Sequence, residues 1–566
     1  MEVKRNQRTF FIFLFIAFII ALAFRFIHLE RPALTDMEAR FALEAQAVAE
    51  GETPIFSEHI GYVGLTSLSF FIFQAGNFWA RLWPALIGSL IVFMPYVFIR
   101  WIGRLGAIML AFILAISPEM VGLSRMIGSP MMALIFLLAA IGFLYHRKPV
   151  LLGIAAAMGL MSGPGFWLGG LIFVLSSLIR YQNIMNSDIF SLNLIEDKRR
   201  FGLHTGIAFG IIILLIGTCF LLAPAGLTGV FSGLVQWFQG FGQGYAKPYG
   251  LFPITLITYM APALFFGLWG GIRGVVFRSA KDIFLLTWFL LGLALILVLP
   301  GSQPADLIWV SLPLWTLSAR FFADVWQTLH FSKKVVVFTA ILTIITMAFL
   351  ALSFRSLVNF SPQDSNWLNA FIAVSAGIAL IAAVLLLVRF GWSHEVALSG
   401  FMLGLILVMS ALLISVSVNS TGINPNPNYT LWYPEQAYHT SEFLQVTLER
   451  VIDWNASSGI PVEIAVVDAD TPALRWALRD HSPVNFVPFL PPQSQVGIII
   501  SDNQTIPEIA NSYRGQDLVT SRVVPWHELA PQQYLRWWIT GEVPTLANEN
   551  IIWVRTNLMP DAQFSP

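Results

Sequence analysis

Asp36, Glu38 and Arg40 form a closely spaced charged cluster in the segment that follows the first apolar run of the chain. A carboxylate held beside a reacting hydroxyl can remove its proton as a general base. The alternative is that Asp36 and Glu38 only complement the dipole of a helix that begins at this point. The sequence alone leaves both interpretations open.

A helix is the element that would position these charges. Thr35 is of a residue type that caps helices, and apolar residues recur at Phe41, Ala45 and Val48. This spacing predicts an amphipathic helix that lies on the outer surface of a membrane.

Further ionisable side chains stand near the ends of apolar runs. Arg81 and Arg125 fall near one predicted membrane face. A basic residue there can simply anchor a helix end by snorkelling. Ionisable residues in membrane spans, however, are usually functional. His28 and His59 flank the charged cluster. Two histidines lack a third ligand for a metal ion, which favours an interfacial position for both.

The composition is that of an integral membrane protein. Of the 566 residues, 56% are hydrophobic and 11% are charged, and the mean hydropathy is +0.71. A soluble domain carries about 25% charged residues. The net charge of zero argues against a nucleic-acid partner, and the single cysteine, Cys219, excludes an internal disulfide and a thiolate metal cluster.

A helix needs about 20 mostly apolar residues to cross a bilayer. The first apolar run, 10–27, is too long for a signal peptide and lacks a small-residue cleavage site, so we expect a retained helix. Scanning the chain predicts about thirteen spans, at 10–28, 79–101, 105–117, 127–145, 149–162, 164–180, 204–224, 252–272, 282–299, 305–321, 334–354, 367–388 and 395–417.

The basic residues before position 420 fall mostly in loops on the side of the N-terminus. The positive-inside rule therefore predicts a multi-pass protein of the plasma (cytoplasmic) membrane with a cytoplasmic N-terminus, and an odd number of spans puts the C-terminus outside. Residues 1–419 form the predicted membrane domain, with the first outer loop at 29–78.

Residues 420–566 are richer in Pro, Asn and Asp and are predicted to form a small extracytoplasmic α/β domain. We expect helices at 435–454 and 471–480 and strands at 463–467, 484–487 and 496–501. No repeat and few charges within the spans are found, which disfavours a secondary transporter.

The segment TDMEARFALEAQAVAEG, followed by FWARLWPALIGSLIVFMPYVF, resembles the N-terminal signature of GT-C glycosyltransferases. That fold is shared by protein O-mannosyltransferases and lipid A aminoarabinose transferases. Residues 123–127 are similar to the S-R-x-I segment of these families. Residues 475–480 and 534–538 resemble segments of a prokaryotic subgroup described as flippase-activity-associated or glycosyltransferase-like.

The resemblance implies a mainly α, GT-C type bundle and an inverting glycosyltransferase. Such an enzyme moves a sugar from a polyprenyl-phosphate donor to a lipid, glycan or protein acceptor at the outer face of the membrane. Asp36 and Glu38 are the implied catalytic residues. The implied substrate-binding residues are Arg40, His59, Arg81, Arg125 and Lys247.

Three polar positions of the family are small or apolar in this chain: 61–65, 128–130 and 162–165. With fewer acidic residues, basic side chains are favoured over a divalent metal ion as the counter-charge of the leaving phosphate. The alternative is a catalytically diminished GT-C scaffold that binds a lipid-linked saccharide or assists an export or glycosylation complex.

Overall fold

The computed structural model describes residues 2–179, 197–242, 249–328, 334–360, 364–419, 421, 429–456, 462–481, 483–503 and 510–558. Lys247, one of the predicted substrate-binding residues, lies outside the described residues.

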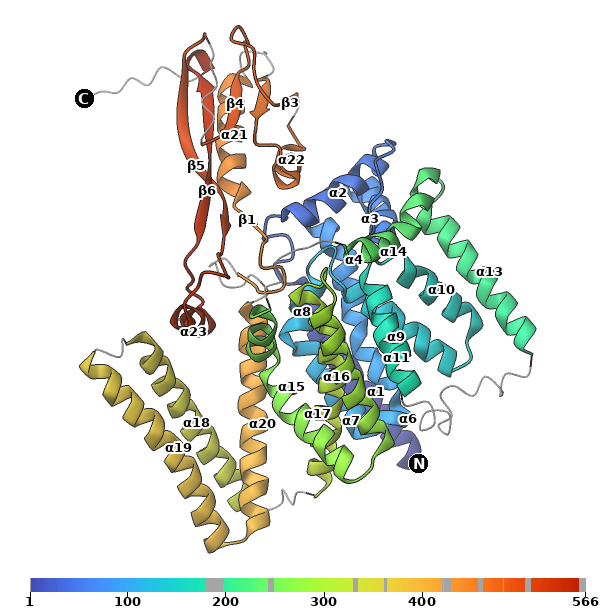
Figure 1. Ribbon diagram of the computed structural model, residues 1–566, viewed down its shortest axis with the longest axis vertical. Coiled ribbons are helices and arrows are strands. Elements are labelled where there is room, and N and C mark those ends of the chain that lie inside the picture. The colour runs from blue at the N-terminus through green and yellow to red at the C-terminus, as the bar shows by residue number, and fades with distance from the viewer. Residues whose placement is uncertain are drawn as a thin grey trace.

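Helices dominate the chain and form a bundle below a C-terminal sheet domain (Figure 1). The N-terminal half of the bundle contains α1 (Glu2–Phe26), α2 (Asp36–Ala49), α3 (Ile60–Phe73), α4 (Asn77–Ser89), η1 (Leu90–Phe93), α5 (Met94–Val97), α6 (Ile99–Ile102), α7 (Arg104–Ile116), α8 (Pro118–Ser124), α9 (Met131–Tyr145), α10 (Pro149–Leu160) and α11 (Gly165–Ile179). The second half contains α13 (Lys198–Gly217), η3 (Pro224–Gly226), α14 (Leu227–Gln239), α15 (Leu251–Val276), α16 (Ala280–Val298), η4 (Pro304–Leu307), α17 (Ile308–Thr328), α18 (Lys334–Asn359), α19 (Ser365–Gly391) and α20 (His394–Asn419).

The helices confirm a mainly α membrane bundle. By length and composition, eight helices among the described residues can cross a membrane, or nine if the bent pair α7 and α8 forms one span. The remaining predicted spans correspond to the shorter apolar helices α9, α10 and α11 and to α17. A multi-pass membrane protein follows from these helices.

The helix predicted after Thr35 is confirmed as α2. The Thr35 hydroxyl accepts from the Glu38 amide, and the Glu38 carboxylate accepts from the Thr35 amide, which completes a capping box. The predicted position of this helix on a membrane surface stays a prediction, but its apolar residues Phe41, Ala45 and Val48 are buried in the main core of the protein. The apolar stripe of α2 therefore packs on protein and not on lipid.

The C-terminal domain is a six-stranded sheet of order β1-β5-β6-β4-β2-β3 with three helices. Its elements are β1 (Tyr438–His439), α21 (Ser441–Ala456), β2 (Ile464–Val467), α22 (Pro472–Leu478), β3 (Val484–Val487), β4 (Ile498–Asp502), β5 (Tyr513–Val523), α23 (Pro531–Thr540), β6 (Leu546–Arg555) and η5 (Thr556–Leu558). Strand β2 pairs in parallel with β3 and β4, whereas β6 is antiparallel to β4 and β5.

The predicted strands and the helix at 471–480 are confirmed as β2, β3, β4 and α22. The predicted helix at 435–454 begins later, at Ser441, because β1 occupies 438–439. The long hairpin of β5 and β6, which carries α23 at its end, was not predicted. Most residues of β5 are exposed or half-buried, so this strand lacks the apolar run by which strands are recognised.

The sheet domain rests on the bundle through α2 and the loops around it (Figure 1). His439 and the Ala473 amide bond to Asp36, and the Trp476 indole donates to Asn77. Trp432, in the segment that precedes β1, stacks on Tyr259 of α15 with ring centroids 4.3 Å apart. The core of the bundle therefore continues into the domain.

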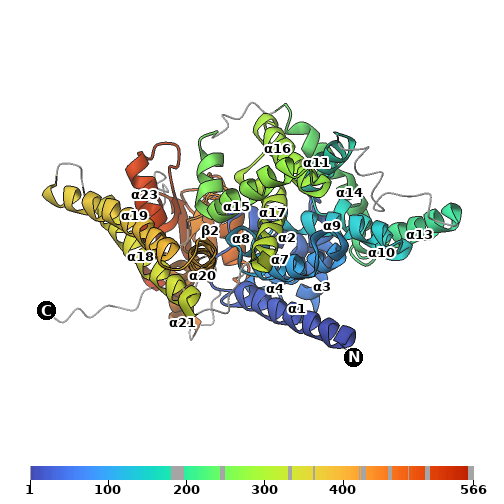
Figure 2. The ribbon, with the colours of Figure 1, turned by 90° about the horizontal axis from the view of Figure 1, so that it is seen from below.

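Helices α18, α19 and α20 form a group at one side of the bundle in both ribbon views (Figures 1 and 2). Gly400 and Gly404 are spaced by four residues on α20 and face Thr339 and Thr343 of α18. A Cβ atom at Gly404 would lie 2.8 Å from the Ala340 carbonyl oxygen. Small residues at this spacing let two membrane helices approach closely.

We expect Gly404→Val to destabilise the packing of α18 on α20 by about 1–3 kcal/mol, because the added methyl groups have no space. Thermal unfolding in detergent measures the loss. Gly206→Val is the matched control, since a Cβ atom there meets nothing within 4 Å on an apolar helix. Equal stability of the two variants would contradict this packing.

Candidate active site

A cavity of about 410 Å³ opens on the side of the bundle that carries the sheet domain. Its wall combines α2, the loop before α3, the starts of α9 and α11, α14, the loop between α16 and η4, and the segment 433–435. Met37 and Phe41 line it from α2. Among its lining residues the formally charged side chains are Glu58, Asp306 and Glu435.

Glu58 is the cavity carboxylate with the most defined surroundings. Arg40 Nη2 donates to Glu58 Oε1 at 2.7 Å, and Gln236 Nε2 donates to the same oxygen at 3.1 Å. Burial raises the pKa of Glu58, but His59, Arg40 and Gln236 lower it more, so the pKa lies below its usual value. Glu58 Oε2 has no side-chain hydrogen-bond donor among the residues described.

His59 lies next to this carboxylate and is 7% exposed. Its ring meets Phe41 edge to face, with centroids 4.7 Å apart. Burial lowers the pKa of His59 to about 4, so the ring is neutral at pH 7. A neutral imidazole can donate or accept a hydrogen bond, but it supplies no positive charge to an anionic ligand.

Two glycines let aromatic rings approach the backbone closely at the cavity. Gly163 has φ +89, and a Cβ atom there would lie 2.4 Å from His59 Cε1. Gly128 has φ +78, and its Cβ atom would lie 2.6 Å from the ring of Phe41. Only glycine fits such a close approach in this backbone conformation. Glycine at both positions therefore makes room for rings that line the cavity.

The other two carboxylates lie across the cavity from α2. Asp306 accepts a hydrogen bond from the Gln303 amide at 2.9 Å and caps η4. Glu435 follows Tyr433, whose hydroxyl is directed toward the Gly128 carbonyl at 3.5 Å. Among the described residues, no three His, Cys, Asp or Glu side chains lie close enough together to hold a metal ion.

Glu38, a predicted catalytic residue, is buried in an ion pair with Arg81. Arg81 Nε donates to Glu38 Oε1 at 2.9 Å and Nη2 donates to Oε2 at 2.7 Å. The Ile127 amide also donates to Oε1, and Thr35 donates to Oε2. Both oxygens are occupied, and Glu38 is absent from the cavity lining.

The other hydrogen bonds of Arg81 go to backbone carbonyls of the loop before α2. Its Nη1 donates to the Pro32 carbonyl at 2.7 Å, and its Nη2 donates to the Ala33 carbonyl at 3.1 Å. These contacts hold the loop before α2 onto α4. Arg81 is 4% exposed and does not line the cavity.

Asp36, the other predicted catalytic carboxylate, faces the sheet domain. His439 Nε2 lies 2.9 Å from Asp36 Oδ2, and the Ala473 amide donates to Oδ1 at 3.1 Å. Burial raises the pKa of Asp36, but the bonds to His439, Ala473 and Thr471 outweigh it and hold the pKa below its usual value. Asp36 thus joins α2 to β1 and α22.

Arg125 caps the end of α1. Its guanidinium donates to the carbonyls of Arg25, Ile27 and His28, and to the Thr421 carbonyl at 3.0 Å. The side chain therefore satisfies carbonyl groups that the helix leaves unpaired at its C-terminus.

The structure places His59 in the cavity lining and pairs Arg40 with the lining residue Glu58. The lining does not include Asp36, Glu38, Arg81 or Arg125. The catalytic and binding roles of these residues stay predictions. Sequence reasoning missed Glu58 and Gln236. The signal that could have identified Glu58 is its position directly before His59, in a loop that leads into an apolar helix.

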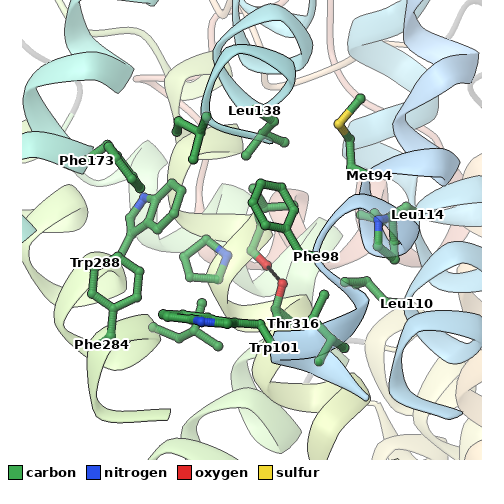
Figure 3. Close-up of a pocket in the computed structure, with 16 residues that line it drawn as sticks. Met94, Phe98, Trp101, Leu110, Leu114, Leu138, Phe173, Phe284, Trp288 and Thr316 are labelled. Atoms are coloured by element: carbon green, nitrogen blue, oxygen red, sulfur yellow. Dashed lines mark hydrogen bonds between the residues drawn. The ribbon is translucent and has the colours of Figure 1, made fainter. Parts of the chain in front are cut away.

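A second cavity, of about 90 Å³, lies among α5, α6, α7, α9, α11, α16 and α17 (Figure 3). Its wall is apolar, with Phe98, Trp101, Phe173 and Trp288 turned into it. The Thr316 hydroxyl in this wall donates to the Leu312 carbonyl at 2.8 Å. The residues that line this cavity include no acid or base, in contrast to those of the first cavity.

Breaking the buried ion pair should be costly. We expect Glu38→Gln to destabilise the protein by about 3–5 kcal/mol, because the Arg81 charge would stay buried without its partner. Thermal unfolding in detergent reports the loss. The double variant Glu38→Gln with Arg81→Met should recover part of it, and a single variant as stable as the parent would refute the structural role of the pair.

Acid should destabilise the site through His59. The pKa of His59 is about 4 in the folded protein and about 6.5 in an unfolded chain, so its contribution is complete above pH 6.5. As the pH falls from about 6.5 to about 4, the unfolded state gains the proton first and stability drops by up to about 3 kcal/mol. Unfolding temperatures at pH 7.5 and pH 5 measure the drop.

His59→Gln is the comparison, because its side chain does not titrate. We expect the unfolding temperature of this variant to change less than that of the parent between the two pH values. The same change in both proteins would exclude His59 as the source of the pH dependence.

The comparisons with known proteins agree with this architecture. No protein-family model and no curated protein matches the sequence. The chain is similar to the crystal structure of ArnT from Cupriavidus metallidurans bound to undecaprenyl phosphate, at 14% identity and a TM-score of 0.55, covering 97% of this chain and 98% of that one. The apo form of the same protein matches at 15% identity and a TM-score of 0.52, covering 98% and 99%.

A third match is the apo oligosaccharyltransferase of Archaeoglobus fulgidus, at 15% identity and a TM-score of 0.44, covering 87% of this chain and 69% of that one. The likeness to ArnT spans both the bundle and the sheet domain. The resemblance read from the sequence is therefore confirmed at the level of the fold: the chain has the GT-C fold of membrane glycosyltransferases.

Proposed function

We propose that the protein is a membrane glycosyltransferase that moves a sugar from a polyprenyl-phosphate donor to an acceptor at the outer face of the membrane. The observation that carries this proposal is a cavity on the domain side of a GT-C fold. The largely buried carboxylate of Glu58 lines this cavity. A similar fold binds undecaprenyl phosphate in ArnT, which supports the class of donor.

In the reaction, an acceptor oxygen attacks the anomeric carbon of the donor sugar while the bond from that carbon to the phosphate oxygen breaks. The acceptor proton passes to a carboxylate base, and the phosphate leaves with the bonding electron pair. Glu58 is one of three carboxylates that line the cavity, and its Oε2 faces no side-chain donor among the described residues.

Arg40 forms an ion pair with the proposed base, Glu58, and its positive charge can also attract the phosphate of the donor. Its guanidinium lowers the pKa of Glu58 in the structure. A donor phosphate that attracts Arg40 would weaken this bond, raise the pKa of Glu58 and make it a stronger base. Lys247 follows α14, which lines the cavity, and we propose that it also contacts the phosphate.

Asp36 and Glu38 are proposed to act indirectly, by fixing the position of α2. Glu38 is saturated by Arg81, Thr35 and the Ile127 amide, and Asp36 is bound to the sheet domain. These contacts support a role in fixing α2, from which Met37 and Phe41 line the cavity. Arg81 and Arg125 support the same loop through carbonyl groups.

We further propose that the N-terminus is cytoplasmic and that the sheet domain is extracytoplasmic in the plasma membrane. The distribution of basic residues supports this orientation. The cavity would then open to the side on which nucleotide-activated sugars are absent, which is consistent with a lipid-linked donor.

A catalytically diminished scaffold is the second candidate function. The observation in its favour is the buried ion pair of Glu38 and Arg81. The hydrogen-bonding atoms of the predicted catalytic residue Glu38 and of the predicted substrate-binding residue Arg81 are occupied by protein partners and not by a substrate. Such a protein would bind a lipid-linked saccharide without transferring it.

Three variants distinguish the candidate bases: Glu58→Gln, Asp36→Asn and Glu38→Gln, each assayed with a labelled polyprenyl-phosphate sugar. We expect Glu58→Gln to reduce transfer by about 10²–10⁴-fold, the usual contribution of a general base. Asp36→Asn should reduce it less. Glu52→Gln is the matched control, because Glu52 is exposed in the same loop.

Full activity of Glu58→Gln together with loss of activity in a folded Asp36→Asn protein would move the base to Asp36. Binding of the labelled donor without transfer by the parent protein would favour the diminished scaffold. Absence of both binding and transfer across polyprenyl-phosphate donors would refute the proposed function.

A further inference from the structure

Helix α23 lies at the far end of the long β5–β6 hairpin, away from the rest of the sheet domain (Figure 1). It contacts α18, and Figure 1 shows it at the end of the α18–α20 group nearest the domain. Trp537 of α23 and Trp526 belong to the same buried cluster as Leu413 of α20. The hairpin therefore brings a short helix to the level at which candidate membrane spans end.

The two sides of α23 differ. Trp537 is 8% exposed and packs against Trp526, with ring centroids 4.8 Å apart. Leu535 and Trp538 project from another side and are 38% and 43% exposed. The helical spacing of Tyr534 places it beside them, and its hydroxyl donates to the Trp526 carbonyl. One side of α23 holds the domain together, and the other presents apolar surface.

The exposed side continues the apolar surface of the neighbouring spans. Near their ends, α18 and α19 expose Phe360 and Leu368, and α20 exposes Leu412. Aromatic side chains are enriched at the level where membrane and water meet, and an amphipathic helix there buries its apolar face among the lipids. The lipids of one membrane leaflet would therefore cover the apolar faces of both α23 and the spans.

The charges near α23 favour lipid without a requirement for acidic headgroups. Arg536 Nη2 lies 2.7 Å from Glu542 Oε2, so the basic residue of the helix is already neutralised by the residue two positions beyond its end. Binding would depend on the burial of Leu535 and Trp538 and not on the attraction of anionic headgroups.

We propose that α23 is an interfacial membrane anchor, in which Leu535 and Trp538 enter the lipid leaflet on the domain side and fix the end of the β5–β6 hairpin. This anchor is a second attachment of the sheet domain, in addition to the contacts with α2. It does not depend on the proposed glycosyl transfer, because it follows only from the position and the exposed side of α23.

The test places a nitroxide label at Leu535→Cys, Trp538→Cys or Gln516→Cys in the full chain, with Cys219→Ala as background. Leu535 is partly exposed, so its label disturbs little of the core. Gln516 is exposed on β5, seven residues before the strand ends, or about 23 Å along it. Each protein is placed as one copy per nanodisc of neutral phosphatidylcholine, and collision with oxygen and with a water-soluble nickel chelate is measured.

We expect the ratio of oxygen to nickel collisions to be several-fold higher at positions 535 and 538 than at 516. One copy per disc in purified form excludes a second copy or a partner protein as the source of protection. A label at 535 that is as accessible to nickel as the label at 516 would overturn the proposal, whatever the Trp538→Cys protein shows. Unchanged elution and unfolding temperature confirm that the labelled proteins are folded.

Discussion

The buried ion pair of Glu38 and Arg81 is the contact on which the arrangement of the loop at 29–78 depends. It joins the start of α2 to α4, and the same two side chains bind the loop at 32–33 and the amide of Ile127. Three segments distant in sequence, around residues 32–38, 81 and 127, thus meet at one charge pair. A buried charge without its partner is costly, so each segment is held where it satisfies the pair.

This constraint gives α2 two different sides. Asp36, next to the capped end, binds His439 and the Ala473 amide of the sheet domain, whereas Met37 and Phe41 line the cavity. The domain and the cavity are therefore attached to the same rigid helix. A movement of the domain that breaks its bond to Asp36 would change the cavity wall, because α2 has no flexible joint between these residues.

The sequence predicted those parts of the fold that depend on local patterns. Long apolar runs indicated the spans, and Thr35 with Glu38 indicated the start of α2, since capping needs only neighbouring residues. The environment of Glu58 was not predictable in this way, because Gln236 lies 178 positions away along the chain. Likewise, β5 is stabilised by pairing with β6 and not by an apolar run of its own.

Few charged side chains are present in the sequence, and in the folded chain even fewer basic side chains are free to bind a phosphate. Arg81 and Arg125 are the most obvious partners for a phosphate, yet their donors are occupied by backbone carbonyls and by Glu38. Arg40 remains beside the cavity with a half-exposed side chain. Because Arg40 also lowers the pKa of Glu58, one guanidinium would have to serve both the base and the phosphate. Proton removal and phosphate binding are then coupled, since a phosphate that attracts Arg40 also strengthens the base.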